Sequence, residues 1–267
     1  MLKVDLHLHA SEDKREPVMF YDAKMLIDRA KELEFDALAI TLHDQFFYNE
    51  DIKKYADSRD IILIPGIEKE IEDKHVLILN IDKYPDIDKL EDLAKLPKSS
   101  LIIAPHPFYF IGRSVGKFLK ENPSLFHGVE YNSVYLSFLN SANRKAKKFS
   151  VAHNLPLVGN TDCHLLSQFG RTYTLVDAKK DKESIIRAIK NNKVILMTRP
   201  LGFFVFVKFI LRSILSKFAE LFGINMKKVH KTKIKKINDR TEQRKNIKPK
   251  TAEKADDSWD EDLKDPL

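Results

Sequence analysis

The sequence of 267 residues has only one cysteine, Cys163, so no disulfide within the chain can stabilise its fold. At the N-terminus, charge enters at Lys3 and Asp5 and no apolar stretch follows, so we expect no signal peptide there. Both features favour a cytoplasmic protein over a secreted, disulfide-stapled one. Hydrophobic residues make up 43% and charged residues 32%, and this composition and length predict one substantial globular core.

The excess positive charge lies mostly in the C-terminal tail. The net charge is +7, but residues 226–250 hold 11 Lys or Arg and 2 Asp or Glu, and residues 251–267 hold 2 Lys and 7 Asp or Glu. The two segments therefore carry +9 and −5, which leaves +3 for residues 1–225. Because the tail has few large apolar residues, we expect residues 226–267 to be disordered. Weak contact of its basic part with nucleic acid or with an anionic membrane stays open.

Short apolar runs alternate with helical patterns up to about residue 198, which predicts an α/β fold. This many alternating units predict a largely parallel sheet that closes into a barrel. The expected strands are Leu2–Leu6, Ala37–Thr41, Ile61–Pro65, His75–Asn80, Leu101–Ala104, Gly128–Tyr131, Pro156–Gly159, Thr172–Val176 and Val194–Met197. The expected helices are Asp22–Glu34, Asp51–Ser58, Asp88–Leu96, Leu136–His153 and Lys182–Asn191.

Residues 201–224 predict an amphipathic helix, with most of the Phe, Leu and Ile residues on one half and the charged and Ser residues on the other. Charges in the middle of the segment argue against a bilayer span. Three roles are open for this helix: packing of its apolar stripe against the barrel, peripheral contact with a membrane, or docking to a partner protein. The chain thus divides into a barrel over residues 1–198, an amphipathic helix over 199–225 and the charged tail over 226–267.

Histidines and carboxylates gather where the expected strands end. His7 and His9 are two residues apart in an extended segment, so both imidazoles point to one side, and Asp5 on the same side is a candidate for orienting one of them. The loops that follow parallel strands open onto one rim, so ligands from distant segments can converge there. The full set is His7, His9, His43, Glu68, His75, His106, Asp162 and His164.

Six imidazoles and two carboxylates are too many ligands for one zinc ion, which takes about four. A cluster of two or three divalent metals that shares a bridging carboxylate fits the number better. Imidazole and carboxylate ligands together suit Zn, Mn or Fe and disfavour a site built for Mg or Ca.

The ordered motifs Asp5-Leu-His7-Leu-His9, Thr41-Leu-His43-Asp44, Ala104-Pro-His106-Pro107 and Asn160-Thr-Asp162-Cys-His164 resemble those of the polymerase and histidinol phosphatase (PHP) superfamily of phosphoesterases. The resemblance covers residues 2 to about 197. It implies a distorted (β/α)7-type barrel, the PHP fold, with a trinuclear metal site. The family's substrates imply a phosphorylated small molecule or nucleotide as substrate.

The resemblance also implies a division of the ligands among three metals. His7, His9, Glu68 and Asp162 would hold the first metal, and Glu68 would bridge to a second one held by His75 and His106. A third would take His43, His164 and an acidic residue of the loop after His9. The usual position of that acidic residue is Lys14 here, so Asp13 or Glu12 is expected to replace it, and Leu42 stands where the family usually has Asp.

In this reading, a metal-bridging hydroxide held by Glu68 and Asp162 attacks phosphorus. Arg113 and Arg171 are candidate phosphate clamps, because a guanidinium matches phosphate oxygens in a planar fork. Two alternatives remain open: a nuclease that acts on single-stranded ends, and a catalytically inert PHP-fold scaffold or membrane adaptor. The sequence does not give the oligomeric state, and it leaves a peripheral membrane location open beside the cytoplasmic one.

Overall fold

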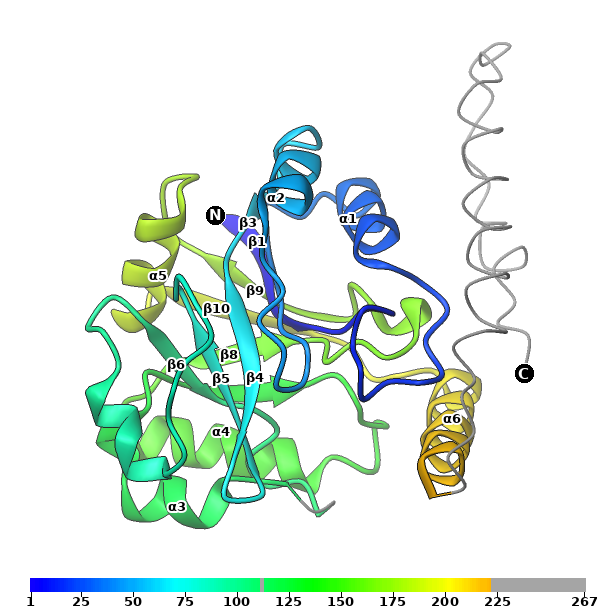
Figure 1. Cartoon of the computed structure of the whole chain (residues 1–267). Coiled ribbons are helices and arrows are strands. Elements are labelled where there is room, and N and C mark those ends of the chain that lie inside the picture. Colours follow the sequence, from blue (N-terminus) through cyan, green and yellow to red (C-terminus); the bar gives the residue numbers. More distant parts are fainter. Residues whose placement is uncertain (111–112, 222–267) are drawn as a thin grey trace.

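The computed structural model describes residues 1–110 and 113–221, so the expectation of disorder for the tail, residues 226–267, lies outside the described residues. Two five-stranded sheets form the centre of the molecule (Figure 1). The first has the order β10-β9-β1-β2-β3, and the second has the order β4-β5-β6-β7-β8. The strands of the first sheet are β1 (Leu2–Leu8), β2 (Ala37–Ile40), β3 (Ile62–Leu63), β9 (Thr172–Val176) and β10 (Val194–Thr198). The second sheet holds β4 (Gly66–Ile71), β5 (Lys74–Leu79), β6 (Leu101–Ala104), β7 (Gly128–Asn132) and β8 (Leu157–Asn160).

The predicted α/β class is confirmed, but the prediction of a largely parallel, closed barrel is wrong for the described residues. β1–β2, β2–β3, β6–β7 and β7–β8 pair in parallel, whereas β1–β9, β9–β10, β4–β5 and β5–β6 are antiparallel. The hairpin β4–β5 was missed because we placed Glu68 in a loop after a strand. Single bridges, His43 with Glu68 and Leu8 with Cys163, link the two sheets where a closed barrel would have continuous ladders.

Helices surround the sheets and begin where side chains can accept from their free amides. Asp22 caps α1 (Ala23–Glu32), Asn49 caps α2 (Glu50–Asp57) and Asp181 caps α5 (Lys182–Lys190), each accepting from a backbone N–H of the first turn. The other two helices of the sheet region are α3 (Gly116–Glu121) and α4 (Ser141–His153), and short 3-10 helices cover Leu90–Lys95, Pro123–Leu125 and Leu166–Gln168. The expected helix Asp88–Leu96 is one of these 3-10 turns.

The apolar interior forms three clusters. One lies between β1, β2 and helices α1 and α2, with Leu26, Ile27 and Leu38 fully buried. The second is centred on β1, β5, β6 and α5, and the third lies between β4–β7 and α3–α4. Burying such side chains stabilises the fold by roughly 1.5–3 kcal/mol each. The rigid packing holds the strand ends, and with them the polar cluster described below, in fixed positions.

The amphipathic helix is present as α6 (Phe203–Leu221), beside the loop between β1 and α1 (Figure 1). Its polar side faces the rest of the protein: the Arg212 side chain is buried, while Phe204, Leu211 and Phe218 are exposed. Packing of the apolar stripe against the barrel was one of the three expectations, and the structure contradicts it. The face that lies inward instead carries Arg212, which pairs with Glu16 and donates to the Val18 carbonyl. No helix in the described part of the chain combines the length and hydropathy that crossing a bilayer requires.

Candidate metal centre

The first two ligand positions follow from the alternation of β1. His7 lies in this strand and His9 directly after it, and both side chains are buried. Their Nε2 atoms lie 3.2 Å apart, as expected for residues two apart in an extended segment. The later members come from other strands and from the loops that follow them, and the sheets bring all eight side chains predicted from the sequence to one place.

Glu68 is the centre of this cluster, because five imidazoles reach its carboxylate. Its Oε2 atom lies 3.3 Å from Nε2 of His7, 3.3 Å from Nε2 of His9 and 3.1 Å from Nε2 of His43. Its Oε1 atom lies 2.7 Å from Nδ1 of His75 and 3.2 Å from Nε2 of His106. Glu68 sits in β4, at the seam between the two sheets, where the bridge with His43 forms. A carboxylate with its two oxygens turned to different imidazole sets has the position that a bridging ligand needs.

Asp162 is the second carboxylate of the cluster. Its Oδ1 atom lies 3.3 Å from Nε2 of His9 and 3.4 Å from Nε2 of His7. Its amide donates to the His7 carbonyl at 2.9 Å, which fixes the strand end of β8 beside that of β1. Asp162 has φ of 50° and His106 has φ of 29°, a left-handed backbone that costs energy in residues other than glycine and that occurs often at functional sites.

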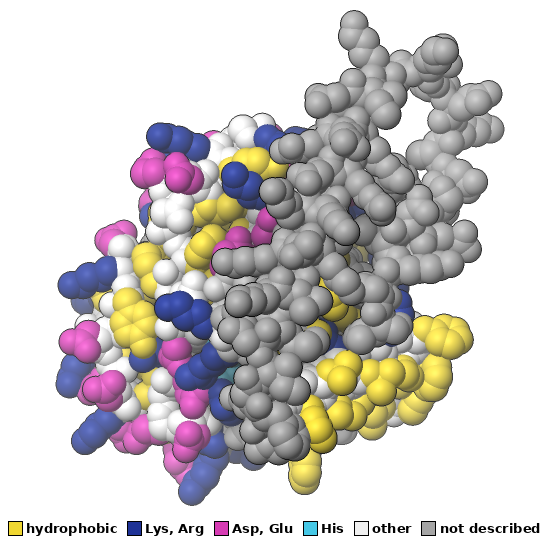
Figure 2. Space-filling model, turned by 45° about the vertical axis from the view of Figure 1, so that its right-hand side comes forward, with side chains coloured by type: hydrophobic (Ala, Val, Ile, Leu, Met, Phe, Trp, Pro, Cys, Tyr) yellow, Lys and Arg dark blue, Asp and Glu magenta, His cyan; other side chains and the backbone are white. Residues whose placement is uncertain are grey.

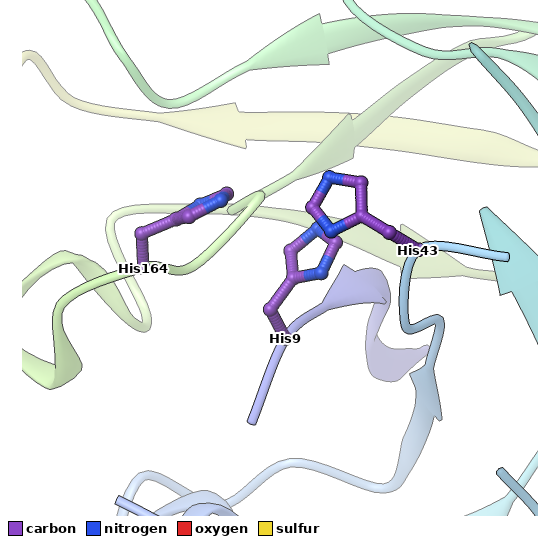
Figure 3. A group of neighbouring side chains, drawn as sticks. All are labelled: His9, His43 and His164. Atoms are coloured by element: carbon purple, nitrogen blue, oxygen red, sulfur yellow. The ribbon is translucent and has the colours of Figure 1, made fainter. Parts of the chain in front are cut away.

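His164 lies on a third side of the cluster, next to His9 and near His43. The rings of His43 and His164 lie on either side of His9 (Figure 3), with ring centres 4.3 Å and 4.6 Å from that of His9. A ligand atom from each of His9, His43 and His164 lies within 4.8 Å of the others. The side chains of His43 and His164 are partly exposed, whereas His9 is fully buried, so this side of the cluster is open.

Acidic partners set the tautomers of the imidazoles. Nδ1 of His7 donates to Glu130 at 2.8 Å, and Nδ1 of His43 and of His9 donate to Asp13 at 2.8 and 3.2 Å. Because a carboxylate can only accept, each Nδ1 carries a proton, and Nε2 is the ring atom turned toward Glu68. An imidazole nitrogen and a carboxylate that can only accept need a cation between them, either a proton on Nε2 or a metal ion.

The chain's own hydrogen bonds leave polar atoms of the cluster without partners. Glu68 Oε2 and both ring nitrogens of His75 are buried and, among the described residues, lack a partner in hydrogen-bond geometry, although His75 Nδ1 lies close to Glu68 Oε1. Buried unpaired polar atoms cost energy and are rare in native proteins. The residues present therefore fit divalent metal ions, and the mixture of imidazole and carboxylate groups fits Zn, Mn or Fe.

The electrostatics of the cluster agree with this fit. Burial disfavours the charged form of His7, but Asp162, Glu130 and Glu68 outweigh it and hold the pKa of His7 well above its usual value. Burial likewise opposes the ionised form of Glu68, but the imidazoles of His75, His7 and His43 keep its pKa well below the usual range. The site is thus strongly anionic and attracts positive charge, whether protons or metal ions.

Two of these acidic partners differ from the expected ones. Asp13, expected as a metal ligand, contacts the Nδ1 atoms of two imidazoles and accepts from the amide of His43 at 2.9 Å, so it orients ligands. Glu130, which we did not predict, has that role for His7, whereas Asp5 accepts from Thr161 and from the backbone amide of His7. Glu130 lies in the expected strand Gly128–Tyr131, and a lone carboxylate among apolar neighbours there was the signal that could have revealed it.

Glu16 is the acidic side chain of the β1–α1 loop that reaches the open side of the cluster. Its Oε1 atom lies 3.1 Å from Nε2 of His164, and its other oxygen pairs with Arg212 of α6. Arg212 is fully buried and donates through Nε to the Val18 carbonyl at 2.7 Å. Glu12, the other expected substitute, accepts from the amide of Ala23 at 3.2 Å and so faces α1.

The two candidate phosphate clamps lie in different surroundings. Arg113 is half exposed and pairs with Glu70 at 2.5 Å, and Glu70 also pairs with Arg15 at 2.5 Å. Glu70 Oε2 lies 3.8 Å from Nε2 of His75, so two arginines stand at the edge of the cluster. Arg171 donates to the carbonyls of Ser167 and Pro200 at 3.3 and 3.5 Å, which directs it toward the segment before α6.

Comparison with known proteins relates this fold to one superfamily. Residues 140–194 match the family PHP_C, described as PHP-associated, and no curated protein matches the chain. A two-domain protein from Bacteroides vulgatus ATCC 8482, which contains a predicted PHP-like metal-dependent phosphoesterase, is similar in structure with a TM-score of 0.59 and 19% identity. That match covers 74% of this chain and 65% of the other, so the chain spans less than two thirds of that protein.

The match to a second solved structure covers nearly all of that chain. PsfC from Pseudomonas syringae PB-5123 has a TM-score of 0.55 and 17% identity, and the match covers 81% of this chain and 98% of that one. At such identities the likeness shows the fold. Together with the PHP-associated match, it supports a PHP superfamily protein.

Proposed function

We propose that the protein is a metal-dependent phosphoesterase that hydrolyses a phosphate ester of a small molecule or nucleotide. The observation that carries the proposal is the convergence of five imidazoles on the buried carboxylate of Glu68. Structural metal sites usually need four ligands and are closed, whereas this cluster offers eight and is open on the side of His43 and His164.

The ligands divide into three overlapping groups. His7, His9, Glu68 and Asp162 would hold one metal, and Glu68, His75 and His106 would hold a second. His43 and His164 form a third group, in which Glu16 is the acidic member. Divalent metals held there would activate a water molecule at neutral pH and neutralise the phosphoryl oxygens.

The chain's own residues supply orientation and charge. Glu130 and Asp13 hold the imidazoles with Nε2 turned inward, so the ligands do not have to reorganise when a metal binds. At the edge, Arg113 is a clamp for the phosphate oxygens, with Arg15 beside it, and Glu70 holds both guanidinium groups until an anion replaces it.

The test is a screen for phosphate release from p-nitrophenyl phosphate, nucleotides, sugar phosphates and histidinol phosphate, with added Mn or Zn. We expect turnover of at least one substrate, inhibition by EDTA, and a loss of more than about 100-fold in Glu68→Gln, since loss of an outer partner alone costs 10–100-fold. His153→Ala is the matched control, because His153 is exposed and lies at the end of α4. Phosphate release that survives in Glu68→Gln, or no release from any substrate, would contradict the proposal.

A further inference from the structure

The outer face of α6 is an apolar stripe that the described part of the protein leaves uncovered. Seven large apolar side chains on it are exposed to solvent: Phe203, Phe204, Val207, Leu211, Ile214, Leu215 and Phe218. At 100° per residue they fall within an arc of about 120°, which is one continuous face of the helix. Figure 2 shows hydrophobic side chains gathered along this part of the surface. A soluble monomer rarely exposes so long a run of apolar side chains.

The orientation of α6 is fixed by its inner face. Arg212 lies about 60° beyond the edge of the stripe. It is only 1% exposed and is held by Glu16 and by the Val18 carbonyl. Rotating the helix to bury the stripe would pull this guanidinium out of its ion pair with Glu16, which also contacts His164. The contacts of Arg212 with Glu16 and Val18 therefore keep the apolar stripe on the outer side of α6.

The two charged side chains that border the stripe are both lysines. Lys208 and Lys217 lie just beyond its two edges, and residues 203–218 contain no Asp or Glu. The sequence that follows, residues 226–250, carries a net charge of +9. Lysines that border an apolar stripe can keep their ammonium groups in the headgroup region while their stems lie along the acyl boundary.

We propose that the outer face of α6 binds the surface of an anionic lipid bilayer, with the helix lying in the plane of the interface. A second copy of the chain fits the stripe less well, because pairing two stripes would bring lysines of like charge together. A bilayer with anionic headgroups matches both the apolar arc and its positive borders. The metal cluster, reached from α6 through Arg212 and Glu16, would then lie next to the membrane surface.

The experiment is flotation of the full chain with vesicles of phosphatidylcholine alone or of phosphatidylcholine with phosphatidylserine. We expect the wild type to float with the anionic vesicles and at least about 10-fold less with the neutral ones. The variant Phe204→Glu/Leu211→Glu should lose binding by about 10-fold or more, because each change removes an apolar side chain from the buried face. Phe138→Glu is the matched control: Phe138 is 79% exposed and Phe204 is 80% exposed, but Phe138 lies outside α6.

Equal flotation of the wild type and the Phe204→Glu/Leu211→Glu variant would overturn the proposal, as would equal binding to neutral and anionic vesicles. Absence of flotation together with a dimer that the same variant turns into a monomer would assign the stripe to a second copy instead. Far-UV circular dichroism and the melting temperature of the variants should match the wild type, since the changed residues are exposed. An unfolded variant is replaced by Leu211→Gln, for which the same loss of flotation is required.

Discussion

Arg212 provides the sharpest test of how α6 is attached. In Arg212→Met, the buried guanidinium disappears, and His164 is then the remaining ion-pair partner of the buried Glu16 carboxylate among the described residues. Breaking a buried ion pair from one side costs about 3–5 kcal/mol. At about 2–4 °C per kcal/mol for a chain of this size, the melting temperature should fall by about 6–20 °C.

The ion pair itself is measured with a double-mutant cycle. Glu16→Gln should also lower the free energy of unfolding, because it leaves the Arg212 charge buried and unpaired. The double variant Glu16→Gln/Arg212→Met removes both charges, so its loss should be smaller than the sum of the two single losses by about 2–3 kcal/mol. Urea denaturation in the presence of EDTA keeps metal occupancy equal among the variants. Arg29→Met is the control, since Arg29 pairs with Glu32 on the surface and should cost less than about 1 kcal/mol. Additive single effects, or a cost of Arg212→Met below about 1 kcal/mol, would refute the reasoning.

Three further outcomes are expected. Glu130→Gln should weaken metal binding by about 10–100-fold with little change in fold, because it loosens the orientation of His7; an unchanged affinity in a metal titration would contradict this. His127 accepts from the amide of Ile102, and burial, with Lys190 nearby, lowers the pKa of His127 to about 4. The unfolded chain therefore binds a proton at His127 more readily than the folded one, and the free energy of unfolding should fall as pH drops from about 6.5 toward 4. The expected loss is about 1–2 kcal/mol, because His127 is partly exposed. His127→Asn should flatten that part of the stability profile. Burial raises the pKa of Cys163 to about 12, so iodoacetamide should label the native protein far more slowly than the urea-unfolded protein.

Much of the metal centre could be predicted from the sequence, because its ligands follow local rules. Alternation in an extended segment puts His7 and His9 on one side, and the structure places them there. The sequence predicted Glu68 as a ligand but placed it in a loop, because the two-residue turn between β4 and β5 gave no strong sequence signal. The hairpin that contains it, β4–β5, is one of the four antiparallel pairings in the two sheets.

The parts that could not be predicted depend on contacts between distant residues. The pairing of Glu16 with Arg212 joins residues 196 positions apart, and periodicity shows that α6 has two faces without showing which one faces inward. The hydrophobic effect favours burial of the stripe, whereas in the structure the face that carries Arg212 and contacts Glu16 lies inward. The prediction of a closed barrel also depended on contacts between distant residues. The two sheets are linked by single bridges where a closed barrel would have continuous ladders.

The most direct test of the account is the metal content of the full chain after purification without chelators, measured by mass spectrometry of the metals. We expect about two or more transition-metal ions per chain in the wild type and fewer than one in Glu68→Gln, because Glu68 reaches five of the imidazoles. A wild-type protein that holds less than about one metal ion even after incubation with Mn or Zn would contradict the central claim that these side chains form a metal centre.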